Sequence, residues 1–107
     1  MKILLIDNIN KSLEEINNLL KQQLCQTASV SDPLIGLKLL QKHKFDIVVI
    51  ADGIAKTTAE NLLKVISIKF PKLIRIAYLS AEIKDINNVA HYVFISPIKN
   101  IDLINTI

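Results

Sequence analysis

Short runs of apolar residues alternate along the chain with segments in which apolar residues recur every three or four positions. The short runs are typical of strands buried on both faces of a parallel sheet, and the periodic segments are typical of amphipathic helices. The predicted strands are Ile3 to Ile6, Cys25 to Val30, Phe45 to Ile50, Leu73 to Leu79 and Tyr92 to Ile95. The third of these runs is the most β-branched, and we expect it to be the central strand.

The first two periodic segments predict helices with recognisable starts. A helix is expected at residues 9–24, where Ser12 and Glu15 have the spacing of a capping box. Ser31-Asp32-Pro33 supplies an N-cap and a proline for the first turn of a second helix, which extends to about residue 43.

A third helix is expected to begin at Thr57, which forms a capping box with Glu60, and to end before Pro71. Between the fourth and fifth strands there is room only for a short helix at about residues 85–89. Residues 98–107 have the pattern of a final helix that stops before about three turns are complete.

Strands that alternate with helices predict right-handed crossovers and a parallel sheet covered by helices on both faces, a three-layer α/β/α domain. The 107 residues are enough for one such domain, residues 1–107, and half of them are apolar, which argues against disorder. In this fold class, ligands bind at the carboxyl ends of the strands.

Composition and spacing exclude several kinds of site. The apolar run at Ile3 to Ile6 ends at Asp7, too soon for a signal peptide or a membrane span, so a cytoplasmic protein is expected. Cys25 is the only cysteine, and His43 and His91 have no partners at metal-ligand spacing, so structural roles are favoured for all three.

Charge and motifs narrow the function further. The net charge is +3, but the lysines are scattered and no run exceeds two basic residues, so nucleic-acid binding through this domain is not expected. There is no Gly-rich phosphate-binding loop after the first strand, and no G-x-S-x-G motif. We therefore predict a protein that is not an enzyme.

The residues that end the predicted strands suggest a family. Ile6-Asp7-Asn8 follows the first strand, Ala51-Asp52-Gly53 the third and Leu79-Ser80-Ala81 the fourth, while residues 92–97 are Tyr-Val-Phe-Ile-Ser-Pro. In this order they resemble the response-regulator receiver (CheY-like) domain over essentially the whole chain. The resemblance implies a flavodoxin-like fold with five parallel strands in the order 2-1-3-4-5, here with a shortened fourth and a truncated fifth helix.

The resemblance also implies a phosphorylation pocket, but an altered one. Receivers hold Mg²⁺ with an acidic pair that corresponds to Asp7 and Asn8, and they phosphorylate an aspartate that, counted from Asp46, corresponds to Ala51. A methyl group cannot form an acyl phosphate. Asp52 comes one residue later, and a slip of one residue turns a side chain to the other face of the sheet, so Asp52 is the alternative phosphoacceptor.

Two further pocket positions differ in how well they match the family. Ser80 corresponds to the Ser or Thr whose hydroxyl follows the phosphoryl group, although a serine that caps the next turn explains it equally well. Ser96-Pro97 replaces the family's Lys-Pro and so lacks the cation, while the X-Pro bond can still be cis. With one carboxylate, Asp7 is a poor Mg²⁺ site, so no cofactor is expected.

The favoured hypothesis is an atypical receiver that acts as a phosphorylation-independent interaction module in signal transduction. Its partner would be a sensor kinase or an effector or output domain, with Tyr92 as a candidate contact or, equally, a half-buried core residue. The alternatives are a receiver phosphorylated on Asp52 and an unrelated flavodoxin-like domain that binds a small ligand. No membrane partner is expected.

Overall fold

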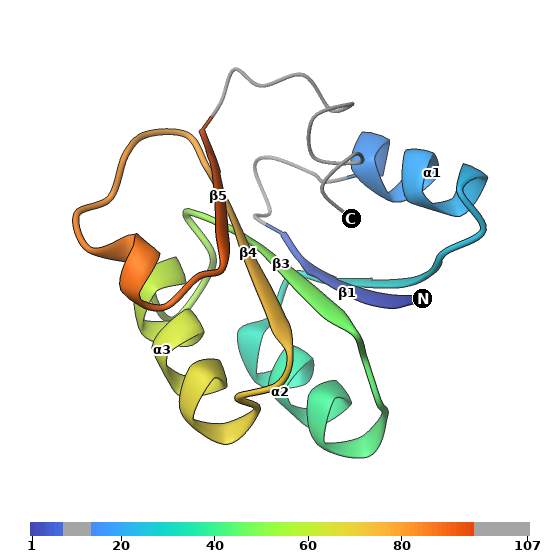
Figure 1. The fold of residues 1–107 in the computed structure, drawn as a ribbon, viewed down its shortest axis with the longest axis horizontal. Helices are drawn as coiled ribbons and strands as arrows, with labels where there is room; N and C mark the ends of the chain where they lie inside the picture. The colour runs from blue at the N-terminus through green and yellow to red at the C-terminus, as the bar shows by residue number, and fades with distance from the viewer. Residues whose placement is uncertain (8–13, 96–107) are drawn as a thin grey trace.

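The structure is a computed structural model, and it describes residues 1–7 and 14–95. Strands and helices alternate along these residues, as the apolar pattern predicts (Figure 1). The strands are β1 (Lys2–Ile6), β2 (Gln26–Val30), β3 (Ile47–Ala51), β4 (Ile74–Leu79) and β5 (Tyr92–Ile95). The helices are α1 (Glu14–Gln22), α2 (Pro33–Lys42), α3 (Ala59–Lys69) and the short 3-10 helix η1 (Ile86–Asn88).

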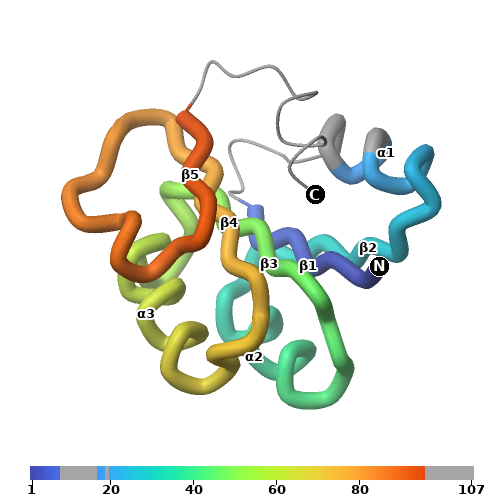
Figure 2. The backbone as a smooth tube through the Cα atoms, viewed as in Figure 1, coloured from blue at the N-terminus to red at the C-terminus, as the bar shows by residue number. Residues whose placement is uncertain are grey.

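The strands form one parallel sheet in the order β2-β1-β3-β4-β5, which confirms the predicted topology (Figure 2). β3 is the central strand, with β1 on one side and β4 on the other. In the pairing of β3 with β4, Ile47 lies opposite Ile74 and Ala51 lies opposite Tyr78. This register brings the polar residues that follow the strands to one edge of the sheet.

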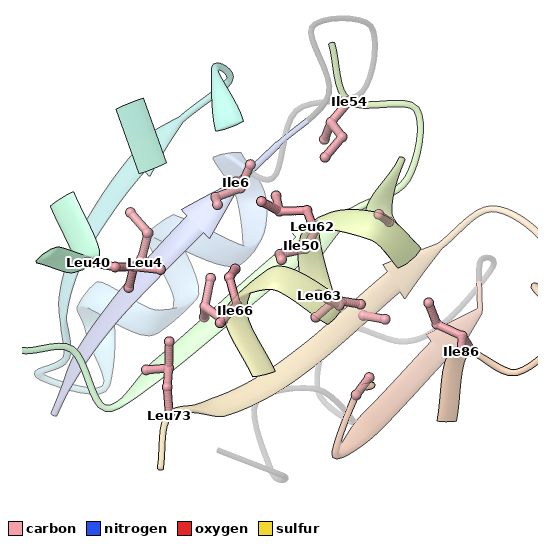
Figure 3. Packing of buried hydrophobic residues seen from close by; sticks show 14 of the residues in the cluster. Leu4, Ile6, Leu40, Ile50, Ile54, Leu62, Leu63, Ile66, Leu73 and Ile86 are labelled. Atoms are coloured by element: carbon pink, nitrogen blue, oxygen red, sulfur yellow. The ribbon is translucent and has the colours of Figure 1, made fainter. Parts of the chain in front are cut away.

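The two faces of the sheet carry separate apolar cores. The larger core joins β1, β3 and β4 to α2, α3 and η1. Figure 3 shows that it extends from Leu73, just before β4, to Ile54, just after β3. On the other face, the smaller core contains Leu20 of α1 and Tyr78 of β4. α1 therefore covers one face while α2 and α3 cover the opposite one, as Figure 1 shows.

Helix α2 begins where the sequence predicts, and its Gly36 faces the Ile6 side chain of β1. Asp32 is its N-cap and accepts a hydrogen bond of 2.8 Å from the Leu34 N–H, and Pro33 occupies the first helical position. A Cβ atom at Gly36 would lie 2.7 Å from Cδ1 of Ile6. A larger residue at this position would therefore have to displace the end of the Ile6 side chain.

The predicted start of the third helix is wrong by one residue. The N-cap of α3 is Thr58, whose side chain accepts a 3.1 Å hydrogen bond from the Asn61 N–H. Thr57 instead donates its N–H to the Ala55 carbonyl at 2.9 Å, which closes the preceding turn. Thr57 therefore lies in the turn before the helix and is not its N-cap, so the capping box of Thr57 and Glu60 does not form.

The segment between β4 and β5 contains only η1, so the prediction of a short helix near residues 85–89 is confirmed, as a 3-10 rather than an α-helical turn. Ser12, the first residue of the other predicted capping box, and the final helix at 98–107 lie outside the described residues. Within residues 1–7 and 14–95, no helix is long and apolar enough to cross a bilayer.

Candidate functional site

The four predicted pocket residues that the structure describes, Asp7, Ala51, Asp52 and Ser80, lie at the carboxyl edge of the sheet. Asp7 follows β1 and donates its N–H to the Val30 carbonyl at 2.9 Å, which continues the pairing of β1 with β2. Ala51 is the last residue of β3, and Ser80 directly follows β4. Because β1, β3 and β4 are adjacent and parallel, their carboxyl ends meet at this edge (Figure 1). Asn8, Ser96 and Pro97 lie outside the described residues.

Ala51 belongs to the apolar core on the α1 face of the sheet. Its exposed fraction is 2%, and it is in the same cluster as Leu5 and Tyr78. A methyl side chain in this place packs against its neighbours and offers no atom that could accept a phosphoryl group.

Asp52 is tied to the residue that follows β4. Its N–H donates to the Tyr78 carbonyl at 3.2 Å, so the pairing of β3 with β4 extends one step beyond the strand. One carboxylate oxygen, Oδ2, accepts the Ser80 N–H at 2.9 Å and the Ser80 hydroxyl at 2.5 Å. The chain then turns at Gly53, where a φ of 67° favours glycine. The carboxylate thus bridges the ends of two neighbouring strands.

Asp7 lies beside β2. The Ser29 hydroxyl donates to Asp7 Oδ2 over a long distance of 3.5 Å, and the Asp7 side chain is half-buried. Among the described residues, no three His, Cys, Asp or Glu side chains gather closely enough to hold a metal ion. Mg²⁺ prefers several oxygen ligands in octahedral geometry, and one oxygen of the other nearby carboxylate, Asp52 Oδ2, already accepts hydrogen bonds from Ser80.

An ion pair at the same edge was not predicted from the sequence. Lys56, in the loop between β3 and α3, places its Nζ atom 2.8 Å from Asp32 Oδ2. The hydrogen bond from Lys56, followed by the one from the Leu34 N–H, holds the pKa of Asp32 below its ordinary value. Lys56 has a φ of 70°, which is uncommon for a residue other than glycine and cannot be predicted from the presence of a lysine. Its pairing with the N-cap of α2 depends on this turn of the loop.

Tyr92 lies at the start of β5, on the edge of the sheet, with 47% of its surface exposed. It is therefore more exposed than a half-buried core residue. His91, just before it, has the structural role expected for a lone histidine, because its Nδ1 accepts the Arg75 N–H at 3.0 Å. The Arg75 side chain donates from Nε to the Val89 carbonyl at 2.8 Å and holds the short connection into β5.

Comparisons of sequence find no relative, because no protein-family model and no curated protein match this chain. Comparison of structures finds chains of similar fold. The response regulator receiver domain protein (CheY-like) from Methanospirillum hungatei superposes with a TM-score of 0.88 at 15% identity, over 98% of this chain and 88% of that chain. The chain has the receiver fold.

Other solved receiver folds agree. The response regulator TrrA from Thermotoga maritima, in complex with Mg²⁺-BeF, matches with a TM-score of 0.88 at 13% identity, over 98% of this chain and 94% of that chain. The signal receiver domain of an HD domain-containing protein from Pseudomonas fluorescens matches with a TM-score of 0.87 at 20% identity, over 97% and 88% of the two chains. The predicted flavodoxin-like α/β fold class is thereby confirmed.

Proposed function

We propose that this chain is an atypical receiver domain in signal transduction that works as a protein-interaction module without phosphorylation. The observation that carries the proposal is the arrangement at the end of β3. Ala51, the position that the family resemblance assigns to the phosphoacceptor, is a buried methyl group. The nearest carboxylate in sequence, Asp52, accepts hydrogen bonds from both the N–H and the hydroxyl of Ser80.

The role of Ser80 supports this proposal. In the family resemblance, the hydroxyl at this position follows the phosphoryl group when the domain is activated. Here the Ser80 hydroxyl donates to a carboxylate of the same chain at 2.5 Å. An internal anion therefore occupies the donor that a phosphoryl group would use, and the ends of β3 and β4 are held together without a modification.

The receiver fold is compatible with an interaction role. The Pseudomonas fluorescens structure that this chain resembles is the signal receiver domain of an HD domain-containing protein, so the fold occurs there beside another type of domain. By analogy, the partner of this chain would be a sensor kinase or an output domain. Tyr92 and Ile95 on the edge strand β5 are 47% and 40% exposed and are the side chains we propose for the contact.

A second candidate function rests on the same contact. Asp52 is only half-buried at the carboxyl edge, and a hydroxyl lies beside its carboxylate, as a relocated phosphoacceptor would need. Under this alternative, Asp7 and Asn8 would contribute to Mg²⁺ binding. The two candidates predict opposite responses to a phosphoryl mimic.

The deciding experiment is a titration of the whole chain, first with Mg²⁺ and then with Mg²⁺ and beryllofluoride. Amide NMR chemical shifts measure the response. Beryllofluoride mimics an aspartyl phosphate. The proposed function predicts no saturable shifts around Asp7, Asp52 and Ser80. A phosphorylatable receiver titrated in parallel confirms that the reagent is active.

Two variants make the result specific. Asp52→Asn removes the charge of the alternative phosphoacceptor, and Asp46→Asn removes an equivalent charge at the opposite end of β3 as a matched control. Saturable shifts that disappear in Asp52→Asn and persist in Asp46→Asn would establish Asp52 as the phosphoacceptor and refute the proposed function.

A further inference from the structure

A cleft lies at the amino edge of the sheet, opposite to the edge that carries Asp52 and Ser80. Its volume is about 600 Å³, which is within the range of small-molecule sites. It lies below the C-terminal ends of α2 and α3 and beside the starts of β3 and β4. Its apolar lining consists of Met1, Leu40, Phe45, Phe70, Pro71, Leu73 and Ile74.

The floor of the cleft is the end of the larger apolar core. Leu40, Phe45 and Leu73 belong to that core and are 7%, 9% and 7% exposed. At the opening, Met1 and Ile74 are 58% and 39% exposed. Water in such a hollow finds few hydrogen-bonding partners, so an apolar group that displaced it would gain hydrophobic free energy.

The charged groups of the cleft are mainly cationic. Lys44 and Lys72 line it and are exposed. Lys2 adds a further ammonium group, which lies 5.2 Å from the centre of the Phe45 ring. The acidic residue in the lining, Asp46, directs Oδ2 to the Lys2 backbone N–H at 2.8 Å. With the three lysines set against one aspartate, the net formal charge around the cleft is positive.

The geometry points to a binding site for an apolar monoanion, an aliphatic or aryl carboxylate, whose hydrocarbon part lies on Leu40, Phe45 and Leu73 and whose carboxylate lies near Lys44 and Lys72. A neutral molecule would gain only the apolar contact, and a cation would be repelled by the lysines. The site is distinct from the carboxyl edge, so the inference goes beyond the proposed function and does not depend on it.

The test uses the whole chain and three probes with the same hydrocarbon: octanoate, octanol and octylammonium. Methyl NMR shifts of Leu40, Leu73 and Ile74 report on the cleft. Leu34, Leu37 and Val65 line a separate hollow of about 360 Å³ between α2 and α3 and serve as an internal reference. We expect saturable octanoate shifts in the first group, and binding in the order octanoate, octanol, octylammonium.

Charge reversal separates this site from general attraction to a basic protein. The double variant Lys44→Glu/Lys72→Glu should weaken octanoate binding about tenfold or more at low salt and make octylammonium the better ligand. The matched control is Lys38→Glu/Lys64→Glu, two exposed lysines of α2 and α3 that do not line the cleft. It changes the net charge equally and should leave octanoate binding within about twofold.

The inference is overturned if octanoate gives no saturable shifts at millimolar concentrations in the folded protein. It is equally overturned if the shifts occur at Leu34, Leu37 and Val65 instead, if octanol binds as tightly as octanoate, or if the control variant weakens binding as much as the cleft variant. None of these outcomes bears on Asp52, so failure here and failure of the proposed function can be told apart.

Discussion

Asp46 and Asp52 lie at the two ends of β3, and each carboxylate accepts a backbone N–H from a neighbouring segment. At the amino end, Asp46 accepts the Lys2 backbone N–H at 2.8 Å, and the Lys2 carbonyl accepts the Asp46 N–H at 2.8 Å. At the carboxyl end, Asp52 accepts the N–H and the hydroxyl of Ser80 at 2.9 and 2.5 Å. The whole of β3 between them is buried.

An aspartate at either end of this central strand links it to a neighbouring segment, because each carboxylate accepts a backbone N–H from there. Asp46 joins β3 to β1 far from the expected pocket. Asp52 bridges from β3 to the residue after β4 with the same kind of hydrogen bond, and in the proposed function its role is the same as that of Asp46. The difference lies in the additional hydroxyl of Ser80.

The largest loss in the free energy of unfolding is expected for substitutions in the buried part of β3, between the two aspartates. Ile50 is fully buried in the larger core, so Ile50→Ala should lower the free energy of unfolding by about 2–5 kcal/mol because it leaves a cavity. Ile50→Val should lower it by about 0.5–1.5 kcal/mol. Urea denaturation measures both. A loss for Ile50→Ala no greater than that for the end aspartates would contradict the view that the strand interior dominates.

The fold was predictable because strands buried on both faces leave a strong mark in a sequence. The continuous, β-branched run Phe45 to Ile50 was enough to predict that β3 lies at the centre of the sheet. The start of α3 was missed by one residue, since Thr57 and Thr58 are equivalent in pattern and only the preceding turn decides which of them caps the helix.

The candidate site was predictable only in part. The sequence placed Asp7, Ala51 and Ser80 at one edge, because parallel strands end together. It did not predict the hydrogen bonds from Ser80 to Asp52, which depend on how the chain turns after β3 and β4 end. The pair of Lys56 with Asp32 was likewise hidden, because it depends on an uncommon backbone conformation of Lys56.

The next largest loss in the free energy of unfolding is expected when each of the two aspartates is replaced by alanine. Asp52→Ala should lower the free energy of unfolding by about 1–3 kcal/mol, since two hydrogen bonds to a charged group are lost, and Asp46→Ala by about 1 kcal/mol. A double-mutant cycle of Asp52→Ala with Ser80→Ala isolates the hydroxyl contribution. A coupling energy near zero would show that the contact between Asp52 and the Ser80 hydroxyl does not stabilise the domain.

A smaller effect on the free energy of unfolding is expected just before β5. There the His91 imidazole, rather than a carboxylate, accepts a backbone N–H, that of Arg75. Burial, and then the charge of Arg75, lowers the pKa of His91 from its ordinary 6.5. Between that lowered pKa and 6.5, the unfolded chain binds more protons than the folded chain, so stability should rise with pH across this window and be lost below it. Protonation of Nδ1 also removes the acceptor for the Arg75 N–H.

The measurement for His91 is urea denaturation at a series of pH values from about 5 to 8, with the pKa followed by NMR. The variant His91→Gln keeps a side-chain acceptor and cannot titrate, so the part of the pH slope assigned to His91 should disappear. If the slope persists unchanged in the variant, the pH dependence belongs to another group and the role assigned to His91 is wrong.

The smallest effect concerns Asp32, a carboxylate that follows β2 and caps a helix instead of joining two strands. Its pKa is lowered by the hydrogen bond from Lys56, then by that from the Leu34 N–H. Between the lowered pKa and its ordinary 3.8, the unfolded chain binds more protons, so the stability contributed by Asp32 is present above this window and is lost as the pH falls through it.

Lys56→Met should raise the pKa of Asp32 toward its ordinary value, because it removes the ion pair but leaves the N-cap bond to the Leu34 N–H. Carboxyl NMR titration of the wild type and the variant measures the change, and Lys38→Met on the exposed side of α2 is the control. An unchanged pKa in Lys56→Met would mean that the capping bond alone perturbs Asp32. Asp32 would then resemble Asp46, whose carboxylate also accepts a backbone N–H, and the ion pair would add nothing to the edge of the sheet.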